Sequence, residues 1–251
     1  MQCVILAGGR GTRIAPVAPD LPKALIPVGT EPFAHHQLSL LARSGVRQVV
    51  YCIGYRGEAI REFVGTGQRW GLEVLYVDEG EALRGTAGAL RLALDAGVLA
   101  PSFLVLYGDS YLRIDYAAVW AAFERCGRAA LLTVFRNEQR WDASNVLFEA
   151  GQVVLYDKRR RDPRAGEMVH VDYGLGVLQR ATIERYVPPG EVADLADLYH
   201  RLSVEGELAG FEATERFYEI GSPAGLEDLR RHLAAEAPGS AKTGVVVPGS
   251  N

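Results

Sequence analysis

Short apolar runs alternate with segments of helical periodicity through the first half of the chain. Apolar runs of about four to eight residues between glycine, proline or polar residues are typical of buried strands, and apolar positions three and four apart predict amphipathic helices. Their alternation favours a Rossmann-like, doubly wound α/β fold with a mostly parallel mixed sheet flanked by helices. The predicted strands span residues 3–6, 48–53, 73–77 and 103–107, and the predicted helices span residues 33–43, 57–64 and 86–95, the last with Thr86 as its N-cap.

The second half of the chain begins in the same style, and then the alternation lapses. Because no linker and no internal repeat interrupts it, the pattern predicts one domain over residues 1–235, followed by a weakly ordered tail over residues 236–251. The domain divides into two halves, residues 1–127 and 128–235. In the second half the predicted strands span residues 129–135, 146–148, 153–156, 169–178 and 217–220, and the predicted helices span residues 116–126, 182–186, 194–205 and 223–234.

Composition and charge narrow the classes of function. A formal net charge of −4 over 251 residues does not indicate a nucleic-acid surface. No apolar run approaches the roughly 20 residues that span a bilayer, and the N-terminus opens into a strand without the pattern of a signal peptide. Cys3, Cys52 and Cys126 are an odd, widely spaced set, which favours buried thiols over a disulfide. We therefore expect a cytoplasmic protein without nucleic-acid or membrane partners; homo-oligomerisation is left open.

A glycine-rich loop follows the first predicted strand and ends at Arg13. Glycines without Cβ let backbone N–H groups approach an anion closely, and a fixed arginine and lysine add positive charge. The pattern is not a Walker A motif, which would end in Gly-Lys-Ser/Thr, nor a dinucleotide fingerprint, because Ile14 stands where the third glycine would be. The loop therefore predicts a triphosphate site, with Arg13 and Lys23 holding its β- and γ-phosphates.

Lysine is rare in this chain, which makes each lysine informative. Only three of the 27 basic residues are lysines: Lys23, Lys158 and Lys242. A compact ammonium on a flexible stem differs from a planar guanidinium, so a lysine inside the domain indicates a site that requires one. Lys242 lies in the predicted tail and receives no role. Lys158 follows a predicted strand and is expected to bind a second phosphate, whereas the arginines at 160 and 161 are expected to be solvated.

Two acids at strand ends are candidate metal ligands. Asp109 follows Gly108 at the end of an apolar strand, where a carboxylate can reach a Mg²⁺ ion bridging phosphates, although a helix cap is the alternative. Magnesium takes one or two protein carboxylates, and Glu219, before a glycine turn, is the best second ligand. The acids at 78, 79 and 81 together suggest a solvated loop. His35 and His36 lack partners at metal spacing and receive no role.

Asp172 and Gly174 lie in the long glycine-interrupted strand of the second half. Gly174 permits a close approach by a sugar ring, and Asp172 can accept hydrogen bonds from its hydroxyl groups. A β-bulge explains the same residues equally well, and the sequence leaves both alternatives open.

These motifs together resemble those of the sugar-1-phosphate nucleotidyltransferases, or nucleoside-diphosphate-sugar pyrophosphorylases. They follow the family's order over about residues 1–234. The spacing from Arg13 to Lys23 is longer than in molybdenum-cofactor nucleotidyltransferases, which argues against that related family. The matching segments are Leu6-Ala7-Gly8-Gly9-x-Gly11-Thr12-Arg13, Pro22-Lys23, Gly85-Thr86-Ala87-Gly88-Ala89-Leu90, Gly108-Asp109-Ser110, Asp157-Lys158, Asp172-Tyr173-Gly174 and Glu219-Ile220-Gly221-Ser222-Pro223.

The resemblance implies transfer of a nucleoside monophosphate from an NTP to a sugar 1-phosphate, with Mg²⁺ as cofactor and pyrophosphate as by-product. It makes residues 1–127 the NTP-binding half and residues 128–235 the sugar-phosphate-binding half, with Arg13 and Lys23 as catalytic residues. The implied nucleotide contacts are Leu6, Ala7, Gly8, Gly9, Gly11, Thr12, Gly85, Thr86 and Gly108; the implied sugar-phosphate contacts are Asp157, Lys158, Asp172 and Gly174; and the implied metal ligands are Asp109 and Glu219.

Three positions depart from the family's usual residues. Asp157 replaces a glutamate and Glu219 an aspartate, which keeps the charge but changes its reach, and Asp172 replaces an asparagine, which loses the amide donor. The chain also lacks the C-terminal β-helix of some members, so a second acetyltransferase activity is not expected.

The variants most resemble the branch of heptose- and mannose-1-phosphate guanylyltransferases, which implies GTP and a heptose, mannose or sugar-like cyclitol 1-phosphate. Uridylyl, cytidylyl and thymidylyl transfer stay open, because base recognition through backbone groups near residues 6–8 and 83–86 leaves little trace in the sequence. A non-catalytic sugar-nucleotide sensor of the same fold is a further alternative. A glycosyltransferase is disfavoured, because residues 108–111 lack an Asp-x-Asp pattern.

Overall fold

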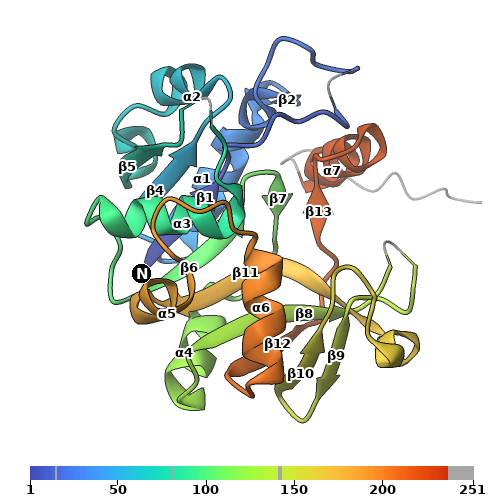
Figure 1. Ribbon diagram of the computed structural model, residues 1–251. Helices are drawn as coiled ribbons and strands as arrows, with labels where there is room; N and C mark the ends of the chain where they lie inside the picture. Colours follow the sequence, from blue (N-terminus) through green and yellow to red (C-terminus); the bar gives the residue numbers. More distant parts are fainter. Residues whose placement is uncertain (15, 81, 141–142, 237–251) are drawn as a thin grey trace, which may run out of the picture.

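A mixed nine-stranded sheet, covered by helices on both faces, organises the computed structural model of the chain (Figure 1). The structure describes residues 1–14, 16–80, 82–140 and 143–236, so the predicted tail beyond Glu236 lies outside the described residues. The strand order is β5-β4-β1-β6-β11-β8-β12-β10-β9. The predicted class, an α/β fold with a mixed sheet flanked by helices, is confirmed. The sheet is less parallel than expected, because its pairings are four parallel and five antiparallel.

The first four strands of this order are parallel. They are β5 (Glu73–Asp78), β4 (Gln48–Ile53), β1 (Gln2–Leu6) and β6 (Ser102–Tyr107). In register, Val4 of β1 lies between Val50 of β4 and Val105 of β6. Their carboxyl ends therefore lie along one edge of the sheet, where open α/β sheets bind ligands.

The other strands extend the sheet with mixed directions. The strand β11 (His170–Gln179) lies antiparallel between β6 and β8 (Ala130–Arg136), and the hairpin of β9 (Val146–Glu149) and β10 (Gln152–Tyr156) closes the far edge. Between them runs β12 (Leu208–Ala213), parallel to β8. The sequence did not predict β12, because alanine, glycine and glutamate have low strand propensity.

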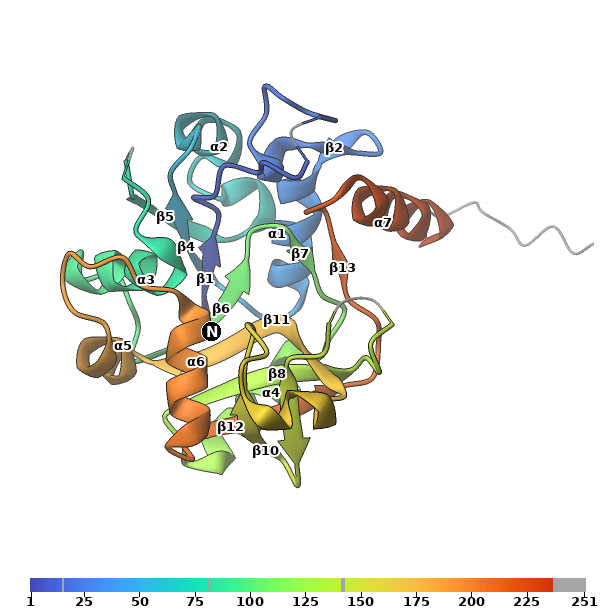
Figure 2. The same cartoon turned by 45° about the vertical axis from the view of Figure 1, so that its right-hand side comes forward.

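Helices cover both faces because each strand alternates its side chains. Cys3 and Ile5 of β1 face one apolar cluster, which includes residues of α1, α2 and α4, whereas Val4 faces the opposite cluster with α3, α5 and α6. Figure 2 shows α6 in front of the sheet. The helices are α1 (Phe33–Arg43), α2 (Gly57–Val64), α3 (Gly85–Asp95), α4 (Tyr116–Cys126), α5 (Arg180–Tyr186) and α6 (Leu195–Val204).

A smaller apolar cluster ties the two ends of the chain together. Ile14 and Ile26 pack with Tyr111, Ile220 and Leu226. It joins the N-terminal loop to the C-terminal helix and places β13 against β7, directly after the end of β6 (Figure 2). The elements are β7 (Ser110–Tyr111), β13 (Tyr218–Glu219), α7 (Pro223–Glu236), the β2 (Pro27–Val28) and β3 (Glu31–Pro32) ribbon, and the 3₁₀ turns η1 (Lys23–Leu25), η2 (Gln68–Trp70) and η3 (Pro163–Glu167).

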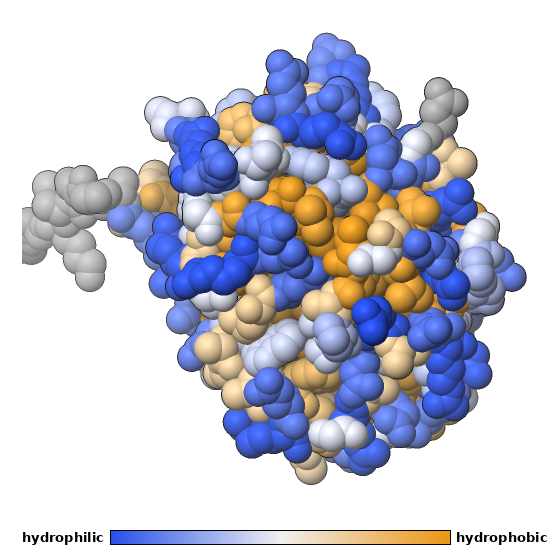
Figure 3. Space-filling model, turned by 90° about the vertical axis from the view of Figure 1, so that its left-hand side faces the viewer, coloured by the Kyte–Doolittle hydropathy of each residue, from blue (hydrophilic) through white to orange (hydrophobic). Residues whose placement is uncertain are grey.

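The surface is mostly hydrophilic around its margins. Figure 3 shows apolar side chains gathered across the middle of one face, with hydrophilic residues above and below them. Of the helices that the structure describes, none has the length and the apolar character to cross a membrane.

Candidate active site

The glycine loop after β1 forms one wall of a cavity of about 210 Å³ at the carboxyl edge of the sheet. Most of the loop and strand-end residues expected at a nucleotide site line it, whereas Gly11, Thr12 and Arg13 are not part of its wall. The lining residues are Leu6, Ala7, Gly8, Gly9, Lys23, Ala24, Glu79, Leu83, Gly85, Thr86, Ala89, Tyr107, Gly108 and Asp109.

Lys23 and Asp109 form an ion pair across this cavity. Lys23 Nζ lies 2.6 Å from Asp109 Oδ2, and the two side chains are 21% and 20% exposed. Lys23 begins η1, and a Cβ on Gly11 would lie 3.1 Å from Lys23 Cγ, so the loop packs directly on the lysine stem. The structure thus brings together two predicted site residues that are 86 positions apart in the sequence.

Arg13 and Glu219 also lie close to Asp109, around Gly221. A Cβ on Gly221 would lie 3.0 Å from Glu219 Oε2, 3.3 Å from Asp109 Oδ2 and 3.4 Å from Arg13 Nη2. The three charged groups therefore surround one methyl-sized volume. Ile220 N donates a hydrogen bond to Asp109 O at 2.9 Å, which holds β13 at the end of β6.

This arrangement fits a magnesium ion. Magnesium usually takes one or two protein carboxylates together with phosphate oxygens, and Asp109 and Glu219 are two carboxylates facing one volume. Within the described ranges there is no group of three or more His, Cys, Asp or Glu residues that would hold a metal by itself. Two carboxylates are as many as magnesium usually takes from a protein, so that Asp109 and Glu219 as its ligands stay a prediction.

Gly85 and Thr86 line the cavity, but their other contacts are structural. Ala193 N donates to Arg84 O, and a Cβ on Gly85 would collide with Ala193 O, so glycine is required there. The predicted Thr86 N-cap is wrong: α3 begins at Gly85, and Thr86 Oγ1 donates to Asp194 Oδ1 at 2.9 Å instead. The N-terminus of α3 is therefore fastened to the segment before α6.

Lys158 and Asp157 lie outside this cavity. They line a second pocket of about 430 Å³, which also includes Arg161 and His200. The buried Asp157 carboxylate accepts backbone N–H groups from Arg159, Arg161 and Asp162. Burial disfavours its ionisation, but these N–H groups prevail and lower the pKa of Asp157. Asp157 therefore shapes the loop that carries Lys158.

The expectation that Arg160 is solvated is wrong. Its guanidinium donates hydrogen bonds to the carbonyl oxygens of Ser144 and Ala165, which joins the loop after β10 to η3. Arg161 is exposed, as expected.

Asp172 is partly buried at the start of β11. Its carboxylate accepts hydrogen bonds from Gly174 N at 2.9 Å and from the Tyr156 hydroxyl at 3.3 Å. Burial raises the pKa of Asp172, opposed by the Gly174 N–H group and the Lys158 charge. The bulge that the sequence left open is present between Asp172 and Gly176, with Gly174 at a φ of +105°. Sugar contacts by Asp172 and Gly174 stay predictions.

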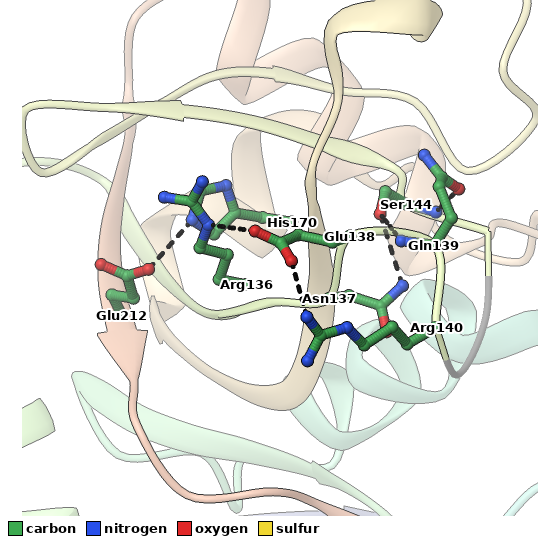
Figure 4. Close-up of polar contacts among 8 residues, drawn as sticks. All are labelled: Arg136, Asn137, Glu138, Gln139, Arg140, Ser144, His170 and Glu212. Atoms are coloured by element: carbon green, nitrogen blue, oxygen red, sulfur yellow. Dashed lines mark hydrogen bonds and ion pairs between the residues drawn. The ribbon is translucent and has the colours of Figure 1, made fainter.

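A polar network links Asn137 and Gln139, after β8, to Ser144, before β9 (Figure 4). Ser144 Oγ accepts a hydrogen bond from the Asn137 side chain at 3.3 Å, and Ser144 N donates to Gln139 Oε1 at 2.9 Å. On the neighbouring strands His170 pairs with Glu212 at 3.0 Å. The same loop leads into β9 through Asn145, whose Oδ1 accepts from Asp172 N at 3.0 Å, so the network fixes the backbone at Asp172.

Glu79, Asp194 and Gly221 are among the residues at or beside the site that received no role from the sequence. Glu79 was grouped with the acids at 78 and 81 as solvated, yet its side chain lines the cavity; residue 81 itself lies outside the described residues. Asp194 ties α3 to α6, and Gly221 lies among the charged groups. Only Gly221 carried a signal, a glycine two residues after a candidate ligand.

The fold and the cavity define an α/β protein with a cavity lined by a glycine loop, a lysine and two acids at the carboxyl edge of its sheet. The nucleotidyl transferase family matches residues 2–144, which is more than half of the chain. The chain belongs to this family.

Curated relatives are similar over most of this chain. It is 28% identical over 243 residues to a mannose-1-phosphate guanylyltransferase of Mycobacterium tuberculosis, covering 93% of this chain and 66% of the relative. It is 26% identical over 220 residues to a UTP–glucose-1-phosphate uridylyltransferase of Synechocystis, covering 82% and 56%. The chain thus spans less than two thirds of the length of these relatives.

Solved structures share the fold. The inositol-1-phosphate CTP transferase from T. maritima has a TM-score of 0.74 at 22% identity, with 96% of this chain and 97% of that chain covered. HddC from Yersinia pseudotuberculosis, complexed with GMP-PN, has a TM-score of 0.73 at 21% identity, with 92% and 99% covered. These likenesses establish the architecture.

Proposed function

We propose that the chain transfers a nucleoside monophosphate from an NTP to a sugar 1-phosphate, giving a nucleoside diphosphate sugar and pyrophosphate. Our preferred substrates are GTP and a mannose-type, heptose-type or cyclitol 1-phosphate, in the cytoplasm. The family match and the relatives named as guanylyltransferases support this choice. Uridylyl, cytidylyl or thymidylyl transfer is the alternative, because relatives and neighbours named for UTP and CTP are also similar.

The observation that carries the proposal is the meeting of Lys23, Asp109, Arg13 and Glu219 beside the glycine loop. Lys23 and Arg13 would contact the β- and γ-phosphates and neutralise the departing pyrophosphate. Asp109 and Glu219 would hold Mg²⁺, which, when bound, supplies further neutralisation of phosphate charge. A sensor without catalysis has no need for all four charges.

The reaction needs no covalent intermediate. A phosphate oxygen of the sugar 1-phosphate, already an anion, attacks the α-phosphorus, and the bond from this phosphorus to the bridging oxygen of pyrophosphate breaks. Lys158, on the loop shaped by Asp157, would hold the attacking phosphate against repulsion by the triphosphate. Positioning and charge neutralisation therefore supply the catalysis.

A substrate panel with a matched variant tests this function. The protein is incubated with Mg²⁺, each of the common nucleoside triphosphates and a panel of hexose, heptose and inositol 1-phosphates, and pyrophosphate release is followed. We expect release that depends on both substrates and is lost in Asp109→Asn, while Asp95→Asn, at an exposed carboxylate near the end of α3, keeps it. No release with any pair, or undiminished release by Asp109→Asn, would contradict the proposal.

A further inference from the structure

The segment before α6 is joined to the first turn of α3 by backbone and side-chain hydrogen bonds. Ala193 O accepts from Ala87 N at 2.9 Å. Thr86 Oγ1 donates to Asp194 Oδ1 at 2.9 Å and accepts from Leu195 N at 2.7 Å. Because a hydroxyl group has one hydrogen to donate, Asp194 takes the donor of Thr86, even though Thr86 lines the cavity.

The same carboxylate begins α6. Asp194 Oδ1 accepts from Ala196 N at 3.0 Å, so one oxygen atom joins the Thr86 hydroxyl on α3 to the first turn of α6. Burial disfavours ionisation, but the Ala196 N–H group and the Thr86 hydroxyl prevail and lower the pKa of Asp194. The charges of Lys158 and Arg159 lower it further. Asp194 is therefore an ionised acceptor at neutral pH, held between two helices.

Farther along, α6 holds the loop that follows β10. Tyr156, at the end of β10, is bound through both of its backbone groups: its N–H donates to Ser203 Oγ at 3.0 Å, and its carbonyl oxygen accepts from His200 Nδ1 at 2.7 Å. Asp197 pairs with Arg159 of the loop at 3.2 Å. Figures 1 and 2 show α6 passing from the level of α3 toward the β9–β10 hairpin. One helix thus contacts the wall of the nucleotide cavity at its start and the loop of residues 157–162 along its length.

Resting on the nucleotidyl transfer proposed above, we propose that Asp194, through its hydrogen bond to Thr86, positions the loop of Lys158 against the nucleotide cavity. In this reaction the attacking phosphate held by Lys158 must lie in line with the α-phosphorus, so the rate depends on how the two sites are placed relative to each other. The Thr86–Asp194 contact joins the two sites through side chains. Asp194 is then a positioning residue, which acts through Lys158 without touching either substrate.

Steady-state kinetics of Asp194→Ala and Thr86→Val test this role. With GTP and mannose 1-phosphate, or whichever pair of the panel above is fastest, each variant should lower kcat about 5- to 20-fold because the attacking phosphate is aligned less often. Both KM values should stay within about threefold. Asp194→Asn keeps an acceptor and Thr86→Ser keeps a donor, so each should restore kcat to within about threefold of the wild type. The double variant Thr86→Val/Asp194→Ala should be no slower than the slower single variant, because both changes remove one shared contact.

Asp115→Ala is the matched control. Asp115 caps α4 in the same way, accepting from Ala118 N at 3.0 Å, and is likewise exposed. It should lose stability as Asp194→Ala does and keep the wild-type kcat. Unchanged kcat in either Asp194→Ala or Thr86→Val, an equal fall in Asp115→Ala, or a rise in the KM for the triphosphate alone would overturn the positioning role.

Hydrogen exchange separates this role from the proposed reaction, because it needs no substrate. Measured by mass spectrometry, Asp194→Ala should speed amide exchange both at residues 85–88 and at residues 157–162, whereas Asp115→Ala should change neither segment. Unchanged exchange in either segment of Asp194→Ala would overturn the link between them. Absence of pyrophosphate release with every sugar 1-phosphate would instead overturn the proposed reaction, and the exchange result would stand.

Discussion

The acids at the cavity and Asp157 of the second half use their carboxylates in opposite ways. Asp109 of the first half and Glu219, which β13 brings beside it from the second half, face a shared volume with Arg13. Glu79 of the first half borders the cavity. In the second half, Asp157 gives its oxygens to three backbone N–H groups. Burial accordingly raises the pKa of Glu79, whereas the backbone hydrogen bonds outweigh burial and lower the pKa of Asp157.

This difference distinguishes carboxylates that could bind a ligand from carboxylates that stabilise the backbone. A carboxylate that is buried beside a cavity, as that of Glu79 is, carries a cost in stability, whereas a carboxylate that accepts several backbone hydrogen bonds stabilises the loop around it. The triphosphate end of the proposed site is therefore built from side chains that converge on one place. The sugar-phosphate end would be the loop after β10, whose backbone is held by Asp157 and on which Lys158 would contact the ligand. Variants in each half should fail in different ways.

The largest effect is expected for Lys23→Ala. Removing the ammonium takes away charge that faces the leaving pyrophosphate, so kcat should fall by about 10²- to 10³-fold. The melting temperature should change little, because the ion pair with Asp109 is partly exposed. Steady-state pyrophosphate release measures kcat, and Lys242→Ala, in the predicted C-terminal tail, serves as the lysine control. A normal kcat for Lys23→Ala would contradict the proposal that the first half binds the triphosphate through Lys23.

A smaller and more selective effect is expected for Lys158→Ala. Its ammonium would contact only the attacking phosphate, so the KM for the sugar 1-phosphate should rise about 10- to 100-fold while the KM for the NTP stays within about threefold. Arg164→Ala, at an exposed position of nearby η3, is the control. An equal rise in both KM values would show that the two halves do not divide the substrates as proposed.

The sequence predicted the fold largely because local patterns and global topology agree in the first half. Apolar runs such as residues 103–107 are buried strands, and the glycine, lysine and aspartate residues at their ends indicate phosphate chemistry by residue type and spacing alone. The strand β12 was missed because Leu208–Ala213 gains its strand conformation from pairing with β8 and not from its own propensity.

Tertiary contacts also explain why individual roles were harder to predict. Whether an acid after a strand is solvated depends on what packs against it, and the approach of Gly8 distinguishes Glu79 from Asp78. Thr86 has the sequence signature of a helix cap, yet its hydroxyl group donates a hydrogen bond to Asp194, 108 residues away. Such long-range contacts leave no periodic pattern in the chain.

A moderate loss of stability is expected for Asp157→Asn. The neutral amide accepts fewer and weaker hydrogen bonds from the three N–H groups, so the free energy of unfolding at pH 7 should fall by about 1–3 kcal/mol. Because folding lowers the pKa of Asp157 below its ordinary 3.8, the wild type has this advantage above pH 3.8 and loses it as the pH falls through the folded-state pKa. Urea unfolding at several pH values measures the difference, which should shrink in acid. Equal stability at pH 7 would contradict the scaffolding role.

The smallest effect, of opposite sign, is expected for Glu79→Gln. Folding raises the pKa of Glu79 above 4.5, so the unfolded chain releases this proton first and the wild type loses stability as the pH rises from 4.5 through the folded-state pKa. Glutamine carries no charge and still accepts from Arg84 N, so the variant should be equally stable or slightly more stable at pH 7, and the gain should vanish below pH 4.5. Urea unfolding of Glu79→Gln beside Asp78→Asn isolates the buried charge. If Glu79→Gln instead destabilised the protein as Asp157→Asn does, Glu79 would belong with the scaffolding acids, and the contrast between the two halves would fail at its most informative residue.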